Sequence, residues 1–346
     1  MKNIKCRDIA EVALERHLDL HSLNNYQGLV TLQGSVQLAD LCKDDLLRER
    51  SIDLLKPFYT GRIKEVGGIY NKMYQCGGNA TAWLVKCGFA PDAMSSLREH
   101  ADELIASHPR DKDGIFGKIG EPEKIWIDSV FAVCPFLTII GQLSGNSIYY
   151  DEACHQMISM DAKLLDSLTG LYFQCLNFAG SGMLSGDHWS RGNGWAAMGL
   201  AEMAVELPAN HSRRQTIKDI FQRHMNACIQ FQDEQGLWHQ DMTDPCSYTE
   251  TSGTGLILYA IGRGLEAGIL DETFRENLYN GLKGCLGYIA QDGSIFNACT
   301  GCLCPGDGSA QAYKSHPWGR NDKHSFGPVI LAFTQAAKIG IDSIAV

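Results

Sequence analysis

The sequence predicts an all-α fold in which helical hairpins form a closed ring, and three observations support this prediction. Along the 346 residues, apolar side chains recur mainly at helical spacing. Almost wholly apolar helices alternate with amphipathic ones, as expected for buried inner helices covered by half-exposed outer helices. A short glycine motif returns four times at a spacing of roughly 60 residues, which suggests a helix-pair repeat.

The repeated motif is a turn glycine followed by an apolar and then an aromatic residue. Its copies are Asp113-Gly114-Ile115-Phe116, Thr169-Gly170-Leu171-Tyr172, Gln235-Gly236-Leu237-Trp238 and Asp292-Gly293-Ser294-Ile295-Phe296. Each copy should close one element and open a short extended piece. A polar cluster follows each copy, so the four clusters should meet at one end of the ring. The clusters are Trp126-x-Asp128, residues 188–195, residues 248–252 and residues 321–324.

Helices are expected wherever the apolar pattern has helical periodicity. In chain order their ranges are 9–18, 46–58, 80–85, 93–107, 129–143, 151–168, 194–207, 212–231, 255–267, 274–289 and 329–339. The ranges that are apolar all round, and should therefore be buried, are 129–143, 194–207, 255–267 and 329–339. About ten to twelve helices would close as six hairpins. An open solenoid is the less favoured alternative, because solenoid repeats are shorter and more uniform, about 33 to 47 residues.

Composition limits the class of protein. Hydrophobic residues make up 45% of the chain, enough for a sizeable core, and no linker or low-complexity tract interrupts it. A single domain over residues 1–346 is therefore expected. The net charge of −10 argues against a general binder of nucleic acid or anionic membrane. One local arginine could still bind an acidic ligand.

The cysteines and the first residues predict a cytoplasmic protein. Thirteen cysteines are scattered singly in apolar runs, where they behave as small core residues. The chain starts with a charged amphipathic stretch that has no apolar signal-peptide core. No run approaches 18 uninterrupted apolar residues, so no membrane span is expected. These observations suit a reducing compartment.

Asp128 is the first candidate catalytic residue. It stands at the expected start of an apolar helix, where an Asp ordinarily caps the free backbone N–H groups. Its apolar neighbours would also desolvate the carboxyl group and raise its pKa, as a general acid near neutral pH requires. Trp126 lies two residues earlier and would point the same way in an extended segment. Both roles, cap and acid, remain open on the residues alone.

The cluster at residues 188–195 is the densest. It holds His188, Trp189, Arg191 and Trp195, a set that suits a planar ligand with a carboxylate, through aromatic stacking and a bidentate ion pair. The equally weighted alternative places both tryptophans in the core and pairs Arg191 with a neighbouring acid. Gly192 and Gly194 would allow an irregular backbone here.

Three further patterns are weaker. Residues 248–252 could simply cap the next inner helix, and His324 could be a structural histidine. Cys299-x-x-Cys302-x-Cys304 has metal-ligand spacing, but a fourth ligand is absent at a supporting distance, with His316 the nearest. A metal or redox role is therefore disfavoured.

In this order, the clusters resemble the unsaturated glucuronyl and rhamnogalacturonyl hydrolases of glycoside hydrolase families 88 and 105, with family 105 the closer. The similar region runs from about Gly67 to the C-terminus. The motifs that carry it are Trp126-Ile127-Asp128, Cys134-Pro135-Phe136-Leu137, Trp189-Ser190-Arg191-Gly192-Asn193-Gly194-Trp195, Gln235-Gly236-Leu237-Trp238, Tyr248-Thr249-Glu250-Thr251-Ser252 and Asn321-Asp322-Lys323-His324-Ser325-Phe326-Gly327-Pro328. The resemblance implies an (α/α)6 barrel of six helical hairpins.

The resemblance also implies a reaction without a metal or organic cofactor. The substrate would be an oligosaccharide that ends in a 4,5-unsaturated uronic acid left by a polysaccharide lyase. Asp128 would protonate C4 and then help water to add at C5. Trp126, Trp189 and Trp195 would stack on the sugar, and Arg191 would hold the uronate carboxylate.

One departure from the family concerns a histidine that usually follows the Gly-Leu-Tyr copy of the motif. Gln174 occupies that region here, and an amide can form hydrogen bonds but cannot carry a proton. His188 could take its place. The family's second acidic residue would fall near residues 73–79, where Cys76 or Asn79 is the candidate polar contact.

Two other functions compete with this one. One is another (α/α)6 glycosidase or a sugar epimerase acting on saturated sugars, which would need a second carboxylate such as Glu250 or Asp187. The other is a catalytically silent carbohydrate-binding protein, as the substitution at Gln174 would suggest.

Overall fold

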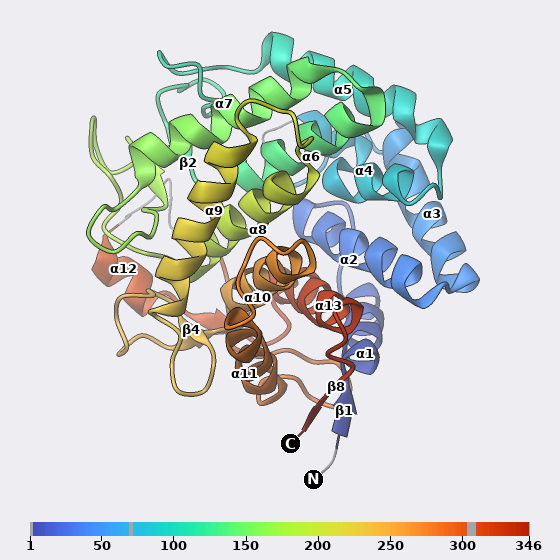
Figure 1. Cartoon of the computed structure of the whole chain (residues 1–346), viewed down its shortest axis with the longest axis vertical. Helices are drawn as coiled ribbons and strands as arrows, with labels where there is room; N and C mark the ends of the chain where they lie inside the picture. The colour runs from blue at the N-terminus through green and yellow to red at the C-terminus, as the bar shows by residue number, and fades with distance from the viewer. Residues whose placement is uncertain (1–2, 69–71, 303–308, 346) are drawn as a thin grey trace.

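The computed structural model describes residues 3–68, 72–302 and 309–345, and within them helices dominate (Figure 1). Six helices form an inner ring: α2 (Tyr26–Cys42), α4 (Gly78–Lys86), α6 (Ser129–Ser144), α8 (Ser190–Glu206), α10 (Thr251–Glu266) and α13 (Lys323–Lys338). Six more cover them outside: α1 (Cys6–Leu20), α3 (Asp45–Tyr59), α5 (Met94–Ser107), α7 (Ser147–Leu164), α9 (Arg214–Ile229) and α11 (Phe274–Leu286). A short helix, α12 (Ala310–Ser315), precedes α13.

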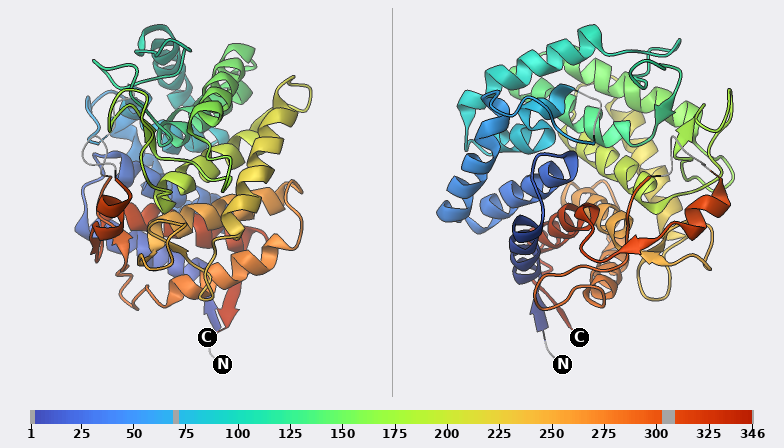
Figure 2. Two further views of the ribbon diagram at one scale, coloured as in Figure 1. Left: turned by 90° about the vertical axis from the view of Figure 1, so that its left-hand side faces the viewer. Right: turned by 180° about the vertical axis from the view of Figure 1, so that it is seen from behind.

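The inner ring is closed. Each inner helix contacts the next, and α13 contacts both α10 and α2 (Figure 2). Strand β1 (Asn3–Lys5) pairs antiparallel with β8 (Ser343–Ala345), which joins the two ends of the chain. The predicted all-α barrel is therefore confirmed, and the open solenoid is excluded.

The four glycine motifs occupy equivalent turns. Each follows an outer helix, namely α5, α7, α9 or α11, and its glycine has a φ between 75° and 87°. This left-handed conformation favours glycine because it has no Cβ. Short two-stranded ladders lie beyond these turns: β2 (Ile125–Trp126) with β3 (Cys175–Leu176), β4 (Trp238–His239) with β5 (Thr249–Glu250), and β6 (Ala298–Cys299) with β7 (Trp318–Gly319). The prediction that each motif opens a short extended piece is confirmed where these strands or bridges follow it.

Helix α2 is the long helix that sequence periodicity missed, and the short α12 was not predicted either. Helix α2 is buried on nearly every side and carries buried glutamines among its apolar residues, so it has no amphipathic pattern. Its start has a recognisable signal, since the side chain of Asn25 accepts a hydrogen bond from the Gly28 N–H and caps the helix.

The irregular backbone that Gly192 and Gly194 would allow is not formed, because both lie inside α8, which begins before the predicted range 194–207. Their neighbours show why small residues stand there. A Cβ on Gly194 would lie 2.9 Å from the Cβ of Leu256, and one on Gly253 would lie 2.5 Å from the carbonyl carbon of Ser190. The glycines thus allow α8 and α10 to approach closely.

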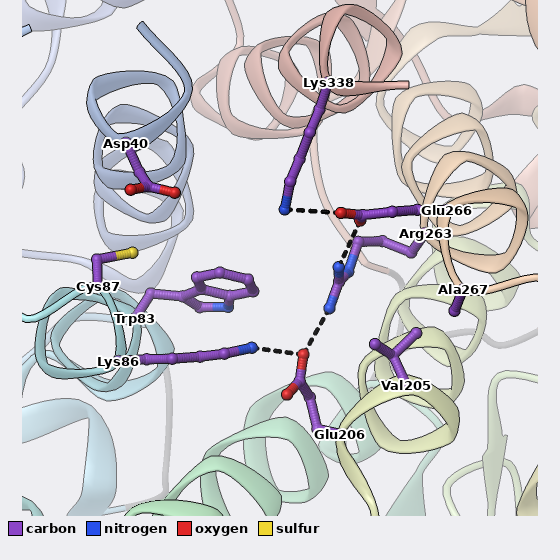
Figure 3. A pocket seen from close by; sticks show the side chains of 10 residues that line it. All are labelled: Asp40, Trp83, Lys86, Cys87, Val205, Glu206, Arg263, Glu266, Ala267 and Lys338. Carbon is purple, nitrogen blue, oxygen red and sulfur yellow. Dashed lines mark hydrogen bonds and ion pairs between the residues drawn. The ribbon is translucent and has the colours of Figure 1, made fainter. Parts of the chain in front are cut away.

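The two ends of the inner ring differ in composition. The N-terminal ends of the inner helices gather the polar clusters predicted from sequence, and we call this end the mouth. The C-terminal ends surround a cavity of about 550 Å³, which we call the rear pocket (Figure 3).

No helix within the described ranges is both long and apolar enough to cross a membrane.

Candidate active site

Asp128 lies at the mouth, directly before α6, and is partly buried. A short ladder holds it in place: Ile125 and Trp126 pair with β3, and the Ile127 N–H donates to the Gln174 carbonyl at 2.9 Å. The side chain of Asp128 forms no cap hydrogen bond with α6. Asp128 therefore does not act as the side-chain cap of α6, which is the usual role of an Asp before a helix.

The environment of Asp128 raises its pKa to about 6. Burial is the main cause, because it penalises the charged carboxylate. The positive charge of Arg191 and a hydrogen bond from Gln174 act in the opposite direction. A carboxyl group with such a pKa is partly protonated near neutral pH, so it can donate a proton and then accept one.

Gln174 is buried and lies beside this carboxyl group. Its side-chain Nε2 is 3.5 Å from Asp128 Oδ2 and 2.7 Å from Cys302 Sγ. Its Oε1 has no hydrogen-bond partner among the described residues. Gln174 is thus in direct contact with the candidate acid, and its correspondence to the family's histidine stays a prediction.

Arg191 is almost fully buried beneath the mouth. Its Nη1 donates to the carbonyl of Cys299 at 2.6 Å and to Ser252 Oγ at 3.1 Å, and its Nη2 donates to the carbonyl of Gly301 at 3.1 Å. Burial opposes the charge of Arg191, but nearby negative groups, including Glu250, raise its pKa above the usual value. Arg191 thus places a permanent positive charge near Asp128 and fixes the backbone of residues 299–301. Its predicted bond to a substrate carboxylate stays a prediction.

The three predicted tryptophans have different surroundings. Trp126 is partly exposed and lies against Phe178, with ring centroids 4.5 Å apart. Trp195 is buried and stacks on Phe131 at 3.9 Å. Trp189 is also buried, and the guanidinium of Arg191 lies 4.4 Å from its ring centroid. By exposure, Trp126 is the one of the three best placed to meet a sugar.

His324 is brought to the mouth but is held by protein groups on both ring nitrogens. Its Nδ1 is 2.6 Å from Asp322 Oδ1, and its Nε2 is 2.8 Å from the hydroxyl of Tyr26 and 2.9 Å from Gln27 Nε2. Burial, together with the charge of Arg191, lowers the pKa of His324 to about 4, so the ring is neutral at pH 7. A neutral ring that donates from Nδ1 accepts at Nε2, where the Tyr26 hydroxyl and the Gln27 amide N–H are both within donating distance.

Tyr26 is the residue of the mouth that sequence reasoning missed. It is the first residue of α2, and it interacts electrostatically with Asp128, Arg191 and Cys302. The Asn25 cap was the available signal, because a residue that follows a cap faces the same end of the ring as the other helix starts.

His188 lies apart from the contacts just described. Its Nε2 is 3.0 Å from Asp166 Oδ2, its Nδ1 is 3.3 Å from Thr243 Oγ1, and its ring packs against Phe173. Its described partners therefore belong to neighbouring loops. Substitution for the family's histidine by His188 stays a prediction.

The two alternative carboxylates have structural partners. Glu250 caps α10: it accepts from the N–H groups of Ser252 and Gly253 and also from the Cys299 N–H. This agrees with the capping interpretation of residues 248–252. Asp187 is buried, which raises its pKa to about 7, and it accepts a hydrogen bond from the Trp189 N–H.

The candidates at residues 73–79 are also bound within the protein. Asn79 Nδ2 donates to the Phe131 carbonyl at 2.8 Å, and the Cys76 thiol donates to the Met73 carbonyl at 2.7 Å. In the cysteine motif, Cys299 is buried and Cys302 is exposed, whereas Cys304 lies outside the described residues. Within the described ranges no group of three or more His, Cys, Asp or Glu side chains is arranged to hold a metal ion.

A closed double ring of helices with an acid of raised pKa at its mouth is the architecture of a helical-barrel glycoside hydrolase. The sequence profile described as Glycosyl Hydrolase Family 88 matches residues 1–339, and the chain belongs to this family. The resemblance derived from the motifs is thereby confirmed.

Curated relatives agree with this assignment. The unsaturated rhamnogalacturonyl hydrolase YesR of Bacillus subtilis (strain 168) is 26% identical over 233 residues, which cover 66% of this chain and 65% of the relative. An unsaturated 3S-rhamnoglycuronyl hydrolase of Formosa agariphila is 26% identical over 156 residues, 42% of this chain and 41% of the relative. The chain thus spans less than two thirds of the length of these relatives.

Solved structures share the fold. A family 105 glycoside hydrolase of C. acetobutylicum superposes with a TM-score of 0.82 at 23% identity, over 95% of this chain and 99% of the other. An unsaturated glucuronyl hydrolase of Bacillus sp. GL1 superposes with a TM-score of 0.74 at 16% identity, over 98% and 96% of the two chains. At these identities the likeness establishes the barrel alone.

Proposed function

We propose that this protein, a single barrel domain, removes a 4,5-unsaturated uronic acid from the non-reducing end of lyase-generated oligosaccharides, of the rhamnogalacturonan type. The observation that carries the proposal is the partly buried Asp128 at the mouth, whose carboxyl pKa is raised to about 6. Family membership and the printed activities of the curated relatives support the same substrate class.

In this mechanism protonated Asp128 donates its proton to C4 of the vinyl ether. The ring oxygen stabilises the positive charge that develops at C5, and water adds there while the Asp128 carboxylate takes up the water's proton. The resulting hemiketal opens, and the bond to the next sugar breaks to release the remaining chain. One carboxyl group suffices, because protonation of the double bond itself generates the oxocarbenium-like cation, whereas ordinary glycosidases need two carboxylates.

The other residues of the mouth would orient the substrate. Trp126 has the exposure to stack on a sugar ring, and the positive charge of Arg191 would attract the uronate carboxylate. The Tyr26 hydroxyl, 2.8 Å from His324 Nε2, would offer its oxygen as an acceptor to a sugar hydroxyl or to the attacking water.

The test uses lyase-generated unsaturated disaccharides and follows the loss of ultraviolet absorbance of the ring double bond. Asp128→Asn should lower kcat/KM by about 10²- to 10⁴-fold, because an amide cannot donate the proton. Asp187→Asn is the matched control: it also removes a buried carboxyl group of raised pKa, but it keeps an acceptor for the Trp189 N–H. We expect this control to keep most of the activity.

Other outcomes would favour the competing functions. Full activity in Asp128→Asn would overturn the role of Asp128. Cleavage of saturated substrates would favour an ordinary glycosidase or an epimerase, and binding without turnover would favour a silent carbohydrate-binding protein. A cytoplasmic location is part of the proposal, supported by the buried thiols that line the core, such as Cys134 and Cys228.

A further inference from the structure

Residues 299–302 run across the mouth and are anchored by buried charged groups. The Cys299 N–H donates to Glu250 Oε1 at 2.9 Å, and Arg191 holds the carbonyls of Cys299 and Gly301. Because Arg191 and Glu250 sit at the N-terminal ends of α8 and α10, this backbone is fixed relative to the inner ring.

The anchored segment brings the side chain of Cys302 against Gln174. The Cys302 thiol is exposed, and its sulfur is 2.7 Å from Gln174 Nε2, the same nitrogen that lies 3.5 Å from Asp128 Oδ2. An amide nitrogen carries two hydrogens, so one can be directed to the sulfur and the other to the carboxylate. Both contacts are made in a single orientation of the Gln174 amide.

The reverse orientation would direct Gln174 Oε1 at the Asp128 carboxylate, and two acceptors repel each other. Because Oε1 has no partner among the described residues, nothing on the oxygen side of the amide fixes this choice. The thiol of Cys302 can accept an amide hydrogen or donate its own S–H, so its contact fixes the position of the Gln174 amide. The Asp128 carboxylate, which can only accept, then selects the orientation with the N–H toward it.

We propose that Cys302 is a positioning residue, which holds the Gln174 amide so that its N–H faces Asp128. The inference rests on the proposed function for its kinetic consequence only. A hydrogen bond from the amide favours the ionised carboxyl group, so loss of the positioning contact should raise the pKa of Asp128 further. Among the described residues, Arg191 from α8 and Tyr26 from α2 also interact electrostatically with Asp128. Tyr26 interacts with Cys302 as well, so Cys302→Ser, which keeps a polar group there, is compared with Cys302→Ala.

The first measurement does not depend on activity. Carboxyl ¹³C NMR of the full chain, with the Asp128 signal assigned by its loss in Asp128→Asn, gives the pKa of Asp128 directly. Cys302→Ala should raise this pKa, and Cys302→Ser, which restores a small acceptor, should return it toward the wild-type value. Cys246→Ala is the matched control because Cys246 is also an exposed cysteine, and this variant should leave the pKa unchanged. An unchanged pKa in folded Cys302→Ala would overturn the proposal.

The second measurement separates this inference from the proposed function. With unsaturated disaccharides, Cys302→Ala should lower kcat by about three- to tenfold, leave KM within about twofold, and move the alkaline limb of the pH profile to higher pH. If the wild type does not turn over these sugars but the NMR shift is present, the proposed function fails and the positioning role stands. If turnover is present and neither kcat nor the pH limb responds to Cys302→Ala, the positioning role fails.

Discussion

The mouth and the rear pocket lie at opposite ends of the inner ring, and the pKa values of their buried carboxyl groups are shifted in opposite directions. At the mouth, Asp128 is desolvated and the charge of Arg191 only partly compensates, so the carboxyl pKa is raised. At the rear, Arg263 is 2.7 Å from Glu206 and 2.8 Å from Glu266, and burial of these carboxylates is outweighed by their cations, so their pKa values are lowered.

The ion pairs of the rear pocket also connect inner helices to one another (Figure 3). Lys86 of α4 pairs with Glu206 of α8, Arg263 of α10 pairs with the same glutamate, and Lys338 of α13 pairs with Glu266 at 2.9 Å. Cations in the last turn of a helix also interact favourably with the helix dipole. The rear network therefore links α4, α8, α10 and α13 through paired charges, whereas the mouth keeps an acid of raised pKa at some cost in stability near neutral pH.

Removing Arg263, the central cation of the rear network, should have the largest effect on the free energy of unfolding. Arg263→Met leaves Glu202 and Glu206 buried with fewer partners, so we expect a loss of about 3–5 kcal/mol in the free energy of unfolding, measured with urea at pH 7. The double variant Arg263→Met with Glu202→Gln should recover part of the loss. If Arg263→Met unfolds like the wild type, the network does not stabilise the rear end.

The carboxyl groups at the two ends of the barrel should make opposite contributions to the pH dependence of stability. Because the folded pKa of Asp128 lies above its unfolded value, the stability from this group is fully present below about pH 4 and is lost as the pH rises through about 6. Asp128→Asn should therefore match the wild type near pH 4 and exceed it by about 2 kcal/mol at pH 8, after allowance for partial exposure. Urea unfolding at the two pH values measures the difference.

Glu206→Gln is the control with the opposite sign. Its folded pKa is lowered, so the stability from this group is present above its unfolded pKa and is lost as the pH falls through the folded value. This variant should be less stable than the wild type at pH 8, and the gap should narrow in acid. Parallel behaviour of the two variants would contradict the contrast between the ends.

The smallest effect is expected at the edge of the rear network. Lys338 pairs with Glu266, but both side chains are partly exposed, so Lys338→Ala should cost less than about 1 kcal/mol. The cost should shrink further in high salt, because exposed charges are screened. Urea unfolding at low and high salt checks this. A larger, salt-independent loss would mean that Lys338 belongs to the buried network.

Much of the barrel could be predicted, because its regularities are local. Turn glycines and the alternation of apolar with amphipathic segments are properties of neighbouring residues, and they located most helices to within a few positions. Helix α2 was not predicted because an inner helix covered on all sides has no polar face, and its buried glutamines interrupt the apolar sequence. Gly194 was misread because its reason is a contact with Leu256, more than sixty residues away.

For the site, local patterns predicted that Asp128, Arg191 and His324 lie at the mouth, since each is at or near the start of an inner helix. The raised pKa of Asp128 was also predicted, from the apolar residues beside it. The place of Tyr26 at the mouth, its contact with His324 and the contact of Gln174 with Cys302 could be read only from the folded structure. Such pairs form between different hairpins. Their distances are set when the ring closes, and no local sequence pattern determines that closure.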